Sequence, residues 1–186
     1  TTTNYKGDVI QVYKNSPENS NYLSFEKHFN NEFQNLLDFI NQNASDILKS
    51  LGYNIEFKLK YKAPSHHKKD KNFEWTPYEV KFIITMYNGV SVKINRPHSF
   101  LNEAKMAAVA TAIRLAILKY RVSSVAPQAL KVLVLDDIMI SLDMSNRDSL
   151  IELIIKDFSF DYQVIFLTHD KSLYNFVYYK ITKYSS

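Results

Sequence analysis

The sequence has no cysteine, hardly any glycine and no long apolar run, and each of these absences excludes a class of protein. Without cysteine there is neither a disulfide framework nor a thiolate metal site. No apolar segment approaches the roughly 20 residues that a membrane-spanning helix requires. The first residues lack the charged-then-apolar layout of a secretory signal. We therefore expect a cytoplasmic protein.

Glycine occurs only three times in the 186 residues, as Gly7, Gly52 and Gly89, and never in a cluster. A phosphate-binding loop of the Walker A form, G-x-x-x-x-G-K-[S/T], is therefore absent. The chain is nevertheless long enough, and at 46% hydrophobic residues apolar enough, to form one compact core. Any nucleotide chemistry in this chain has to proceed without a Walker A loop of its own.

The formal net charge of +4 mildly favours an anionic partner. The densest basic stretch is His66-His67-Lys68-Lys69-Asp70-Lys71, between Pro64 and Trp75. We favour a solvated hairpin loop for this stretch. The alternative is a loop that contacts DNA phosphates, with Lys68, Lys69 and Lys71 as the candidate contacts.

The first half of the chain predicts one long helix followed by a small antiparallel sheet. Residues 1–23 are expected to be extended, with a loop at Pro17. Ser24 is a plausible N-cap for a helix over 25–51 that ends at Gly52. Residues 55–61, 78–87 and 90–94 have strand character, and Asn88-Gly89 has the form of a two-residue hairpin turn. The apolar stripe of the helix consists of Phe25, Phe29, Phe33, Leu36, Leu37, Ile40, Ile47, Leu48 and Leu51.

After Pro97 the pattern changes to alternating helices and strands. Helices are expected over 102–119, over 146–158, and from an N-cap at Asp170 to residue 179. The apolar runs 131–135 and 163–167 are typical of buried parallel strands. We therefore divide the chain into residues 1–95, with the long helix and antiparallel sheet, and an α/β lobe over residues 96–186.

Four motifs in the second half carry the chemistry, and the first is a pair of carboxylates at a strand end. The apolar run Val132-Leu133-Val134-Leu135 stops abruptly at Asp136 and Asp137. Two adjacent desolvated carboxylates are costly, so such a strand end expects a cation or ordered water. By itself the pattern also fits a helix cap or a metal site of another fold.

Three further segments precede or follow this strand. Ser141-Leu142-Asp143 comes shortly after it, and Thr168-His169-Asp170 ends the next apolar strand. Upstream, Leu101-Asn102-Glu103-Ala104-Lys105 opens the alanine-rich helix, whose first turn has free N–H groups suited to a phosphate. A lone histidine at such a strand end is more often a neutral hydrogen-bonding group than a ligand.

Taken in order, these segments resemble the ABC-type ATPase head of SMC-like and DNA-repair ATPases, over roughly residues 95–180. Leu101 to Lys105 matches the signature motif L-S-G-G-[Q/E], and Val132 to Asp137 matches Walker B. Ser141-Leu142-Asp143 matches the D-loop, and His169 matches the switch histidine. The resemblance implies an α/β fold, the C-terminal lobe of a P-loop ABC-type head, with a small antiparallel sheet and a long N-terminal helix added.

The resemblance also implies a role for each matched residue. Asp136 is expected to hold Mg²⁺ and Asp137 to act as general base, while His169 contacts the γ-phosphate of ATP. In the family, two heads enclose two ATP molecules, so Asp143 is expected at the dimer interface. The signature segment, with Asn102 at the position of its serine, is expected to contact the nucleotide of the opposing head; its residues are Leu101, Asn102, Glu103, Ala104 and Lys105.

The sequence departs from the family pattern at two places. Glu103 and Ala104 replace the signature glycines, so the backbone has less freedom to approach phosphate. Asp137 replaces the usual glutamate, and its reach is shorter by about one C–C bond of roughly 1.5 Å. A misplacement of this size can cost on the order of a hundredfold in rate. Either hydrolysis is slow or the backbone compensates.

In this family the Walker A loop lies in an N-terminal lobe, so we expect a piece of a longer protein. Its partners would be that lobe, a second head and DNA, in repair or genome defence. The helix over 25–51 is either the arm of an insertion between the lobes or an ordinary packed helix. Two other functions stay open, namely a structural or partner-binding domain without turnover, and a metal-dependent nuclease using Asp136, Asp137 and Asp143.

Overall fold

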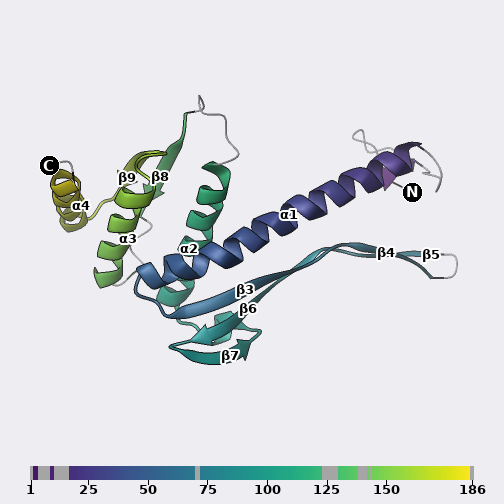
Figure 1. Cartoon of the computed structure of the whole chain (residues 1–186), viewed down its shortest axis with the longest axis horizontal. Helices are drawn as coiled ribbons and strands as arrows, with labels where there is room; N and C mark the ends of the chain where they lie inside the picture. Colours follow the sequence, from purple (N-terminus) through teal and green to yellow (C-terminus); the bar gives the residue numbers. More distant parts are fainter. Residues whose placement is uncertain are drawn as a thin grey trace. The chain divides into compact units, whose positions relative to one another are not determined.

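The computed structural model describes residues 2–3, 9–10, 17–69, 72–122, 130–137, 142 and 144–184 (Figure 1). Two short strands open the chain, β1 (Thr2–Thr3) and β2 (Val9–Ile10), and they pair antiparallel. No helix in the described part is long and apolar enough to cross a membrane. The remaining elements are α1 (Pro17–Ser50), β3 (Ile55–Lys62), β4 (Ser65–Lys69), β5 (Asn72–Thr76), β6 (Glu79–Tyr87), β7 (Val90–Ile94), the 3-10 turn η1 (Pro97–Ser99), α2 (Glu103–Val122), β8 (Val132–Asp136), α3 (Met144–Asp157), β9 (Gln163–Leu167) and α4 (Lys171–Tyr184).

The long helix α1 begins earlier than its sequence pattern indicates. It starts at Pro17, so the loop predicted there is wrong, and so is an N-cap at Ser24. Proline is well suited to the first turn of a helix because the N–H that it lacks would have no partner there. The C-terminal end is as predicted, with Gly52 in the left-handed region at φ +85° just after the last turn.

The antiparallel sheet has the order β3-β6-β7, and its turn is the one that the sequence predicts. Asn88 and Gly89 both have positive φ, at 50° and 81°, as a two-residue turn between twisted strands requires. At the edge of the sheet, Asn41 of α1 hydrogen-bonds both backbone groups of Leu59. Its Nδ2 donates to the Leu59 carbonyl at 3.0 Å, and its Oδ1 accepts from the Leu59 N–H at 2.7 Å. These bonds join α1 to the edge strand β3.

The basic stretch lies in a hairpin, as expected, but in one of its strands rather than its loop. His66 to Lys69 belong to β4, which pairs antiparallel with β5 from Ser65↔Thr76 to Lys69↔Asn72. Residues 70 and 71 lie outside the described residues.

The apolar strands β8 and β9 pair in parallel, as predicted, but they are not buried on both faces. Their residues are in register from Val132↔Gln163 to Asp136↔Leu167. In β8, Leu133 and Leu135 are buried, whereas the residues before and after each of them point to the opposite face and are exposed. The open face carries Val132, Val134, Ile165 and Leu167, which are 40%, 52%, 38% and 48% exposed. We call these four residues the open sheet face.

The other face of this sheet and the helices form the core of the lobe. Its buried side chains include Ala108, Ala112 and Leu115 of α2, Leu150 and Ile154 of α3, and Phe158. At the rim of the core, Lys119 of α2 pairs with Asp157 of α3 at 2.6 Å.

Helices α3 and α4 are joined by an ion-pair cluster. Lys180 of α4 contacts Asp148 at 2.5 Å and Glu152 at 2.9 Å, both on α3. The hydrogen bonds to Asp148 and Glu152 raise the pKa of Lys180, so this ammonium stays charged across the physiological range. The cluster therefore joins the last helix to α3.

The chain divides into two compact units, and the boundaries between them fall inside α1, β3 and β6. One consists of Thr1–Leu37 and Tyr61–Glu79, and the other of Asp38–Lys60 and Val80–Ser186. In the first unit, Tyr61 donates a hydrogen bond to Asn30 at 2.6 Å and packs edge-on against Phe33. The second unit holds the parallel pair β8-β9, most of the three-stranded sheet and the four motifs of the second half of the sequence. A boundary at residue 95 stays a prediction.

We expect Gly52→Ala to destabilise the chain by about 1–3 kcal/mol, because a side chain at positive φ is strained. A Cβ at this position would also lie 2.9 Å from Oδ1 of Asn146. Gly89→Ala is the matched control, since its φ is similar but its nearest atom is 4.0 Å away. Urea unfolding of both variants measures the difference, and equal losses would show that Asn146 does not limit this position.

Candidate functional site

The paired carboxylates lie at the carboxyl end of the parallel strands. Asp136 is the last residue of β8, in register with Leu167 of β9, and its side chain is exposed. The next residue extends the pairing, because the Asp137 N–H donates to the Leu167 carbonyl at 3.1 Å. Both carboxylates therefore stand at the edge of the sheet where parallel α/β folds hold their ligands.

Asp137 has a strained backbone and a specific partner. Its φ is +45°, which is uncommon for a residue with a side chain. Its Oδ2 lies 2.9 Å from Nδ1 of His169, and the histidine side chain is largely exposed. Two motifs that are 32 residues apart in the sequence are thus in direct contact. Asp136, Asp137 and His169 gather at one sheet edge, as the sequence leads us to expect.

The second oxygen of Asp137 gives a test of whether this edge suits a cation. Among the described residues, Oδ1 of Asp137 is buried and has no hydrogen-bond partner. A buried carboxylate oxygen without a donor is costly, so it suits a hard cation or a water held by one. Asp136, the preceding residue, adds a second and exposed carboxylate at this strand end, and carboxylates are ligands that Mg²⁺ prefers. Among the described residues, no group of three or more His, Asp or Glu side chains forms a metal site by itself.

His169 is held in a short turn between two capping residues. Thr168 Oγ1 accepts from the Asp170 N–H at 3.1 Å. Asp170 Oδ1 accepts from the N–H groups of Ser172 at 2.8 Å and Leu173 at 3.3 Å. Asp170 is therefore the N-cap of α4, as predicted, although the helix continues to Tyr184. These bonds orient the exposed imidazole toward Asp137.

The signature segment forms the start of α2. Leu101 is buried, and its N–H donates to the Pro97 carbonyl at 2.8 Å, so its side chain belongs to the core. Asn102 is exposed and caps the helix, because its Oδ1 accepts from the Lys105 N–H at 3.0 Å. Glu103 is exposed in the first turn, and Ala104 is half-buried. The amide NH₂ of Asn102 remains able to donate to an anion.

Lys105 has a partner that sequence reasoning did not find. Its ammonium donates to the Tyr87 hydroxyl at 2.6 Å and lies 5.2 Å from the centre of that ring. Phe100 packs edge-on against Tyr87, with ring centres 4.9 Å apart. Tyr87 ends β6 just before the hairpin turn, and nothing in its local pattern points to α2. It joins the antiparallel sheet to the signature segment.

The D-loop is only partly described. Ser141 and Asp143 lie outside the described residues, so the expected interface role of Asp143 stays a prediction. Leu142 is buried, and its carbonyl accepts a hydrogen bond from Nε of Arg147 at 2.9 Å.

Solved structures with the same architecture include three SMC heads. One, from work on ATP-driven dimerization and DNA-stimulated activation of SMC ATPases, is 18% identical with a TM-score of 0.51. A second is an Smc head bound to the C-winged helix domain of ScpA, at 19% identity and a TM-score of 0.53. The third, from Pyrococcus furiosus, is an Smc head with an extended coiled coil bound to the C-terminal domain of ScpA, at 20% and 0.52. The chain has the fold of an SMC ATPase head.

The structural similarity to the SMC heads covers most of this chain, but the covered fraction of each solved chain differs. The matches cover 77%, 79% and 82% of this chain, and 75%, 39% and 33% of the respective solved chains. No protein-family model and no curated protein matches the sequence. At these identities the comparison establishes the SMC-head fold, and the roles of the individual residues rest on the geometry of the site.

Proposed function

We propose that this chain is the signature and Walker B lobe of an SMC-like ATPase, which hydrolyses ATP when joined to a Walker A lobe and paired with a second head. The observation that carries the proposal is the contact between Asp137 and His169 at 2.9 Å, at the carboxyl end of β8 and β9. We use 'joined protein' for this chain together with its Walker A lobe. The experiment that tests the proposal compares ATP hydrolysis by the joined protein with and without the substitution Asp137→Asn.

In this function, Asp137 accepts the proton of the attacking water. Its Oδ2 is already positioned by His169, and the strained φ of Asp137 turns the carboxylate out of the strand direction. This turn is a physical means by which aspartate can compensate for its shorter side chain. The other edge of the exposed His169 imidazole can contact a phosphate oxygen next to that water, because Nδ1 faces Asp137.

Asp136 would hold Mg²⁺, directly or through water. When bound, this ion supplies positive charge that neutralises the phosphate oxygens of ATP. The turn that carries His169 is fixed by hydrogen bonds from backbone N–H groups to the side chains of Thr168 and Asp170. An active site whose donors are oriented in advance needs little rearrangement during the reaction.

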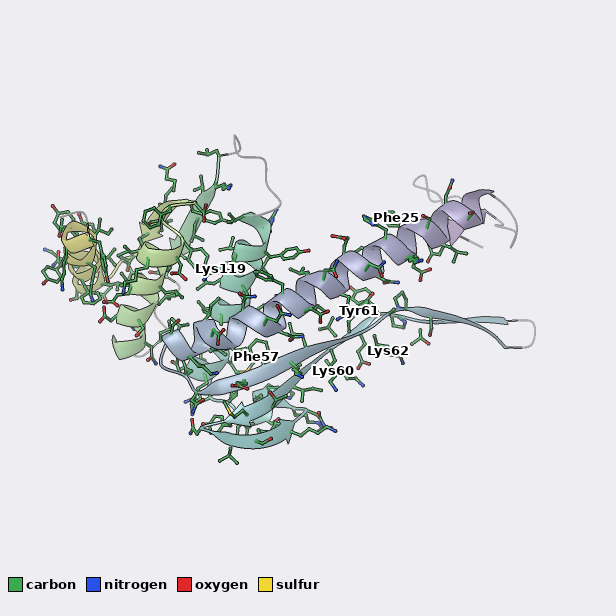
Figure 2. The ribbon with its side chains drawn as sticks, in the orientation of Figure 1. Phe25, Phe57, Lys60, Tyr61, Lys62 and Lys119 are labelled. Atoms are coloured by element: carbon green, nitrogen blue, oxygen red, sulfur yellow. The ribbon has the colours of Figure 1, made fainter. Side chains whose placement is uncertain are left out.

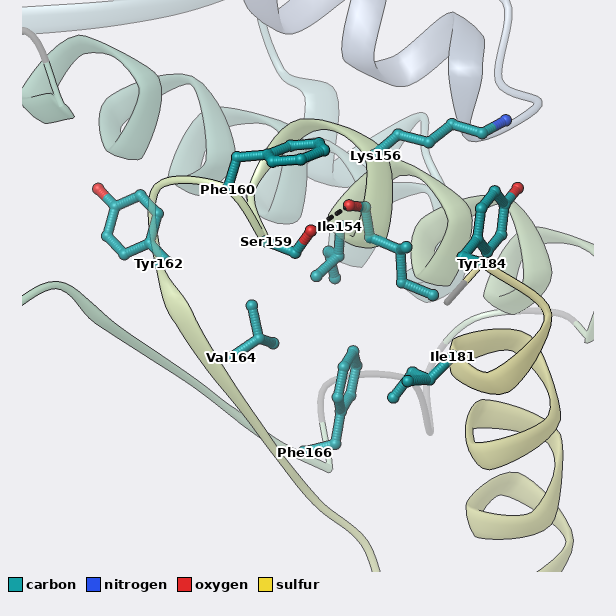
Figure 3. A pocket seen from close by; sticks show the side chains of 10 residues that line it. Ile154, Lys156, Ser159, Phe160, Tyr162, Val164, Phe166, Ile181 and Tyr184 are labelled. Atoms are coloured by element: carbon teal, nitrogen blue, oxygen red, sulfur yellow. Dashed lines mark hydrogen bonds between the residues drawn. The ribbon is translucent and has the colours of Figure 1, made fainter. Parts of the chain in front are cut away.

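The exposed apolar residues of the open sheet face are evidence that a Walker A lobe covers this surface. Parallel strands occur almost only where both faces of the sheet are covered, whereas Val134 and Leu167 are here about half exposed. On the other side of β9, a groove of 530 Å³ is lined by Val164, Phe166 and Ile181, among others (Figure 3). Additional strands beside β9 and a helix over the open sheet face would bury both surfaces.

The exposed residues at the start of α2 are the basis for proposing a second head as a partner. Its exposed signature residues, Asn102 and Glu103, make no contact with the Asp137 and His169 pair in the described structure, so they are available to a nucleotide on another head. The Asn102 amide is the donor that can reach such an anion.

A non-catalytic partner-binding domain is the second candidate function. Two observations favour it, since Lys105 is occupied by Tyr87, and Oδ1 of Asn102 by the helix cap. A wild-type joined protein that does not hydrolyse ATP would favour this candidate.

DNA is proposed as the partner of the lysines on β3. Lys58 and Lys60 are exposed and form no ion pair among the described side chains, while Phe57 points to the opposite side of the strand (Figure 2). Alternate residues of a strand are about 6.7 Å apart on one face, so these ammonium groups form a row that suits a line of phosphates. Lys68 and Lys69 of β4 stay candidates of the same kind.

We expect the double substitution Lys58→Gln and Lys60→Gln to weaken duplex DNA binding at low salt. The slope of log affinity against log salt should fall by about 1 for each lysine, because fewer counterions are released. The matched control is Lys183→Gln, an exposed lysine of α4. Fluorescence anisotropy at several salt concentrations measures the slope, and a slope unchanged from wild type would remove these lysines from the interface.

A further inference from the structure

Arg147, in the first turn of α3, connects two of the motifs. Its Nε donates to the carbonyl of Leu142 at 2.9 Å, in the segment that matches the D-loop. Its Nη1 lies 4.0 Å from Oδ2 of Asp170, beside the switch histidine. The side chain is only 18% exposed, so these interactions form in a partly desolvated setting. The guanidinium thus bridges segments that are 28 residues apart.

The contact with Asp170 reaches the catalytic pair through a short path. Asp170 Oδ1 caps α4, and its Oδ2 faces Arg147. The preceding residue, His169, contacts Asp137. A shift of Asp170 therefore moves the backbone that carries the imidazole, and Arg147 opposes that shift from the side of α3.

The same turn of α3 also contacts the end of the long helix. A Cβ at Gly52, just after the last turn of α1, would lie 2.9 Å from Oδ1 of Asn146, so this side chain is adjacent to the end of α1. Asn146 and Arg147 are neighbours in the first turn of α3. One turn of helix thus contacts the end of α1, the Leu142 carbonyl and the cap of α4.

We propose that Arg147 is a positioning residue, which fixes the D-loop relative to the switch histidine so that His169 meets Asp137 only when the D-loop is in place. This inference rests on the proposed ATPase function. Arg147 contacts Leu142 and Asp170, and we infer that it acts through these two. A change at the D-loop, where a second head would bind, then reaches the imidazole through one guanidinium.

The chemistry of arginine suits this role better than that of lysine. A guanidinium has donors in a fixed planar fork, so one nitrogen can serve the Leu142 carbonyl while another faces the Asp170 carboxylate. A lysine ammonium at the same place can satisfy one of the two partners but is too compact to hold both in the same geometry. Arg147→Lys therefore keeps the charge and removes the bridge.

The test measures steady-state ATP hydrolysis by the joined protein with Arg147→Lys and Arg147→Met. We expect kcat to fall about 10- to 100-fold while KM changes less than twofold, because misplaced catalytic groups lower the rate without removing binding contacts. The matched control is Arg114→Met, an exposed arginine of α2, which should leave both constants unchanged.

A second readout needs no nucleotide. In the 186-residue chain, the nitrogen NMR shifts of the His169 ring report its contact with Asp137. We expect Arg147→Lys and Arg147→Met to change these shifts and Arg114→Met to leave them as in wild type. If the Arg147→Met protein does not fold, the His169 ring shifts of the Arg147→Lys protein alone test the inference.

The outcomes separate this inference from the function on which it rests. A wild-type joined protein that does not hydrolyse ATP would end the proposed function. An active wild-type protein whose kcat and His169 shifts are both unaffected by Arg147→Lys would overturn the role of Arg147 alone. Loss of kcat together with changed shifts supports it.

Discussion

Replacing Asp137 by asparagine is expected to lower the ATPase rate of the joined protein by about 100- to 10,000-fold, the range over which general bases act. The amide that results cannot accept a proton from water at neutral pH. It is nearly the same size as the carboxylate and can still pair with His169, so the fold and nucleotide binding should persist. Phosphate release under saturating Mg-ATP measures the loss.

The matched control for this experiment is Asp161→Asn, in the turn between α3 and β9. Asp161 is exposed, and its N–H bonds to the Phe158 carbonyl, so its side chain has no part in the site. An Asp137→Asn protein as active as the Asp161→Asn protein would show that another group takes the proton. The proposed role of Asp137 as general base would then be wrong.

Replacing Val134 by lysine is expected to abolish association with the Walker A lobe, and with it more than about 99% of the ATPase activity. Val134 is 52% exposed in this chain, in the middle of the open sheet face. A lysine there costs the isolated chain little, because its ammonium reaches water. Once a lobe covers the face, the same charge is buried without a partner, at a cost of several kcal/mol.

The control is Val90→Lys, which places the same change at a residue that is 62% exposed, at the start of β7. Calorimetric titration of the Walker A lobe into each variant measures association, and circular dichroism confirms folding. If Val134→Lys binds the lobe as tightly as Val90→Lys does, a surface other than the open sheet face holds the two lobes together.

The positions of most helices and strands follow from local patterns. Gln163 to Leu167 forms a strand with the bounds of its apolar run, and Asn88-Gly89 makes its turn because these residues tolerate positive φ. The start of α1 is different. Pro17 and the asparagines and serines after it are typical of loops, yet these residues are helical. Local preferences differ by only a few tenths of a kcal/mol per residue, so a long adjoining helix can override them.

The sequence predicted which residues lie at the strand ends but not which side chains they contact. The order of the motifs indicated that Asp137 and His169 would lie at one edge of the sheet, because the carboxyl ends of parallel strands share an edge. The partners of Lys105 and Arg147 could not be predicted. Each interaction joins side chains from different elements, and a single side chain on a helix leaves no periodic signal of what it contacts.

The sequence by itself determined that two apolar strands end in carboxylates and a histidine, that an alanine-rich helix follows Leu101, and that no Walker A loop is present. These are local properties, set by residue type and spacing along the chain. Only the tertiary structure decided that one face of β8 and β9 is open, that the φ of Asp137 is positive, and that Arg147 connects Leu142 to Asp170. Exposure, strain and contact depend on which distant segments pack together, and packing is a property of the whole fold.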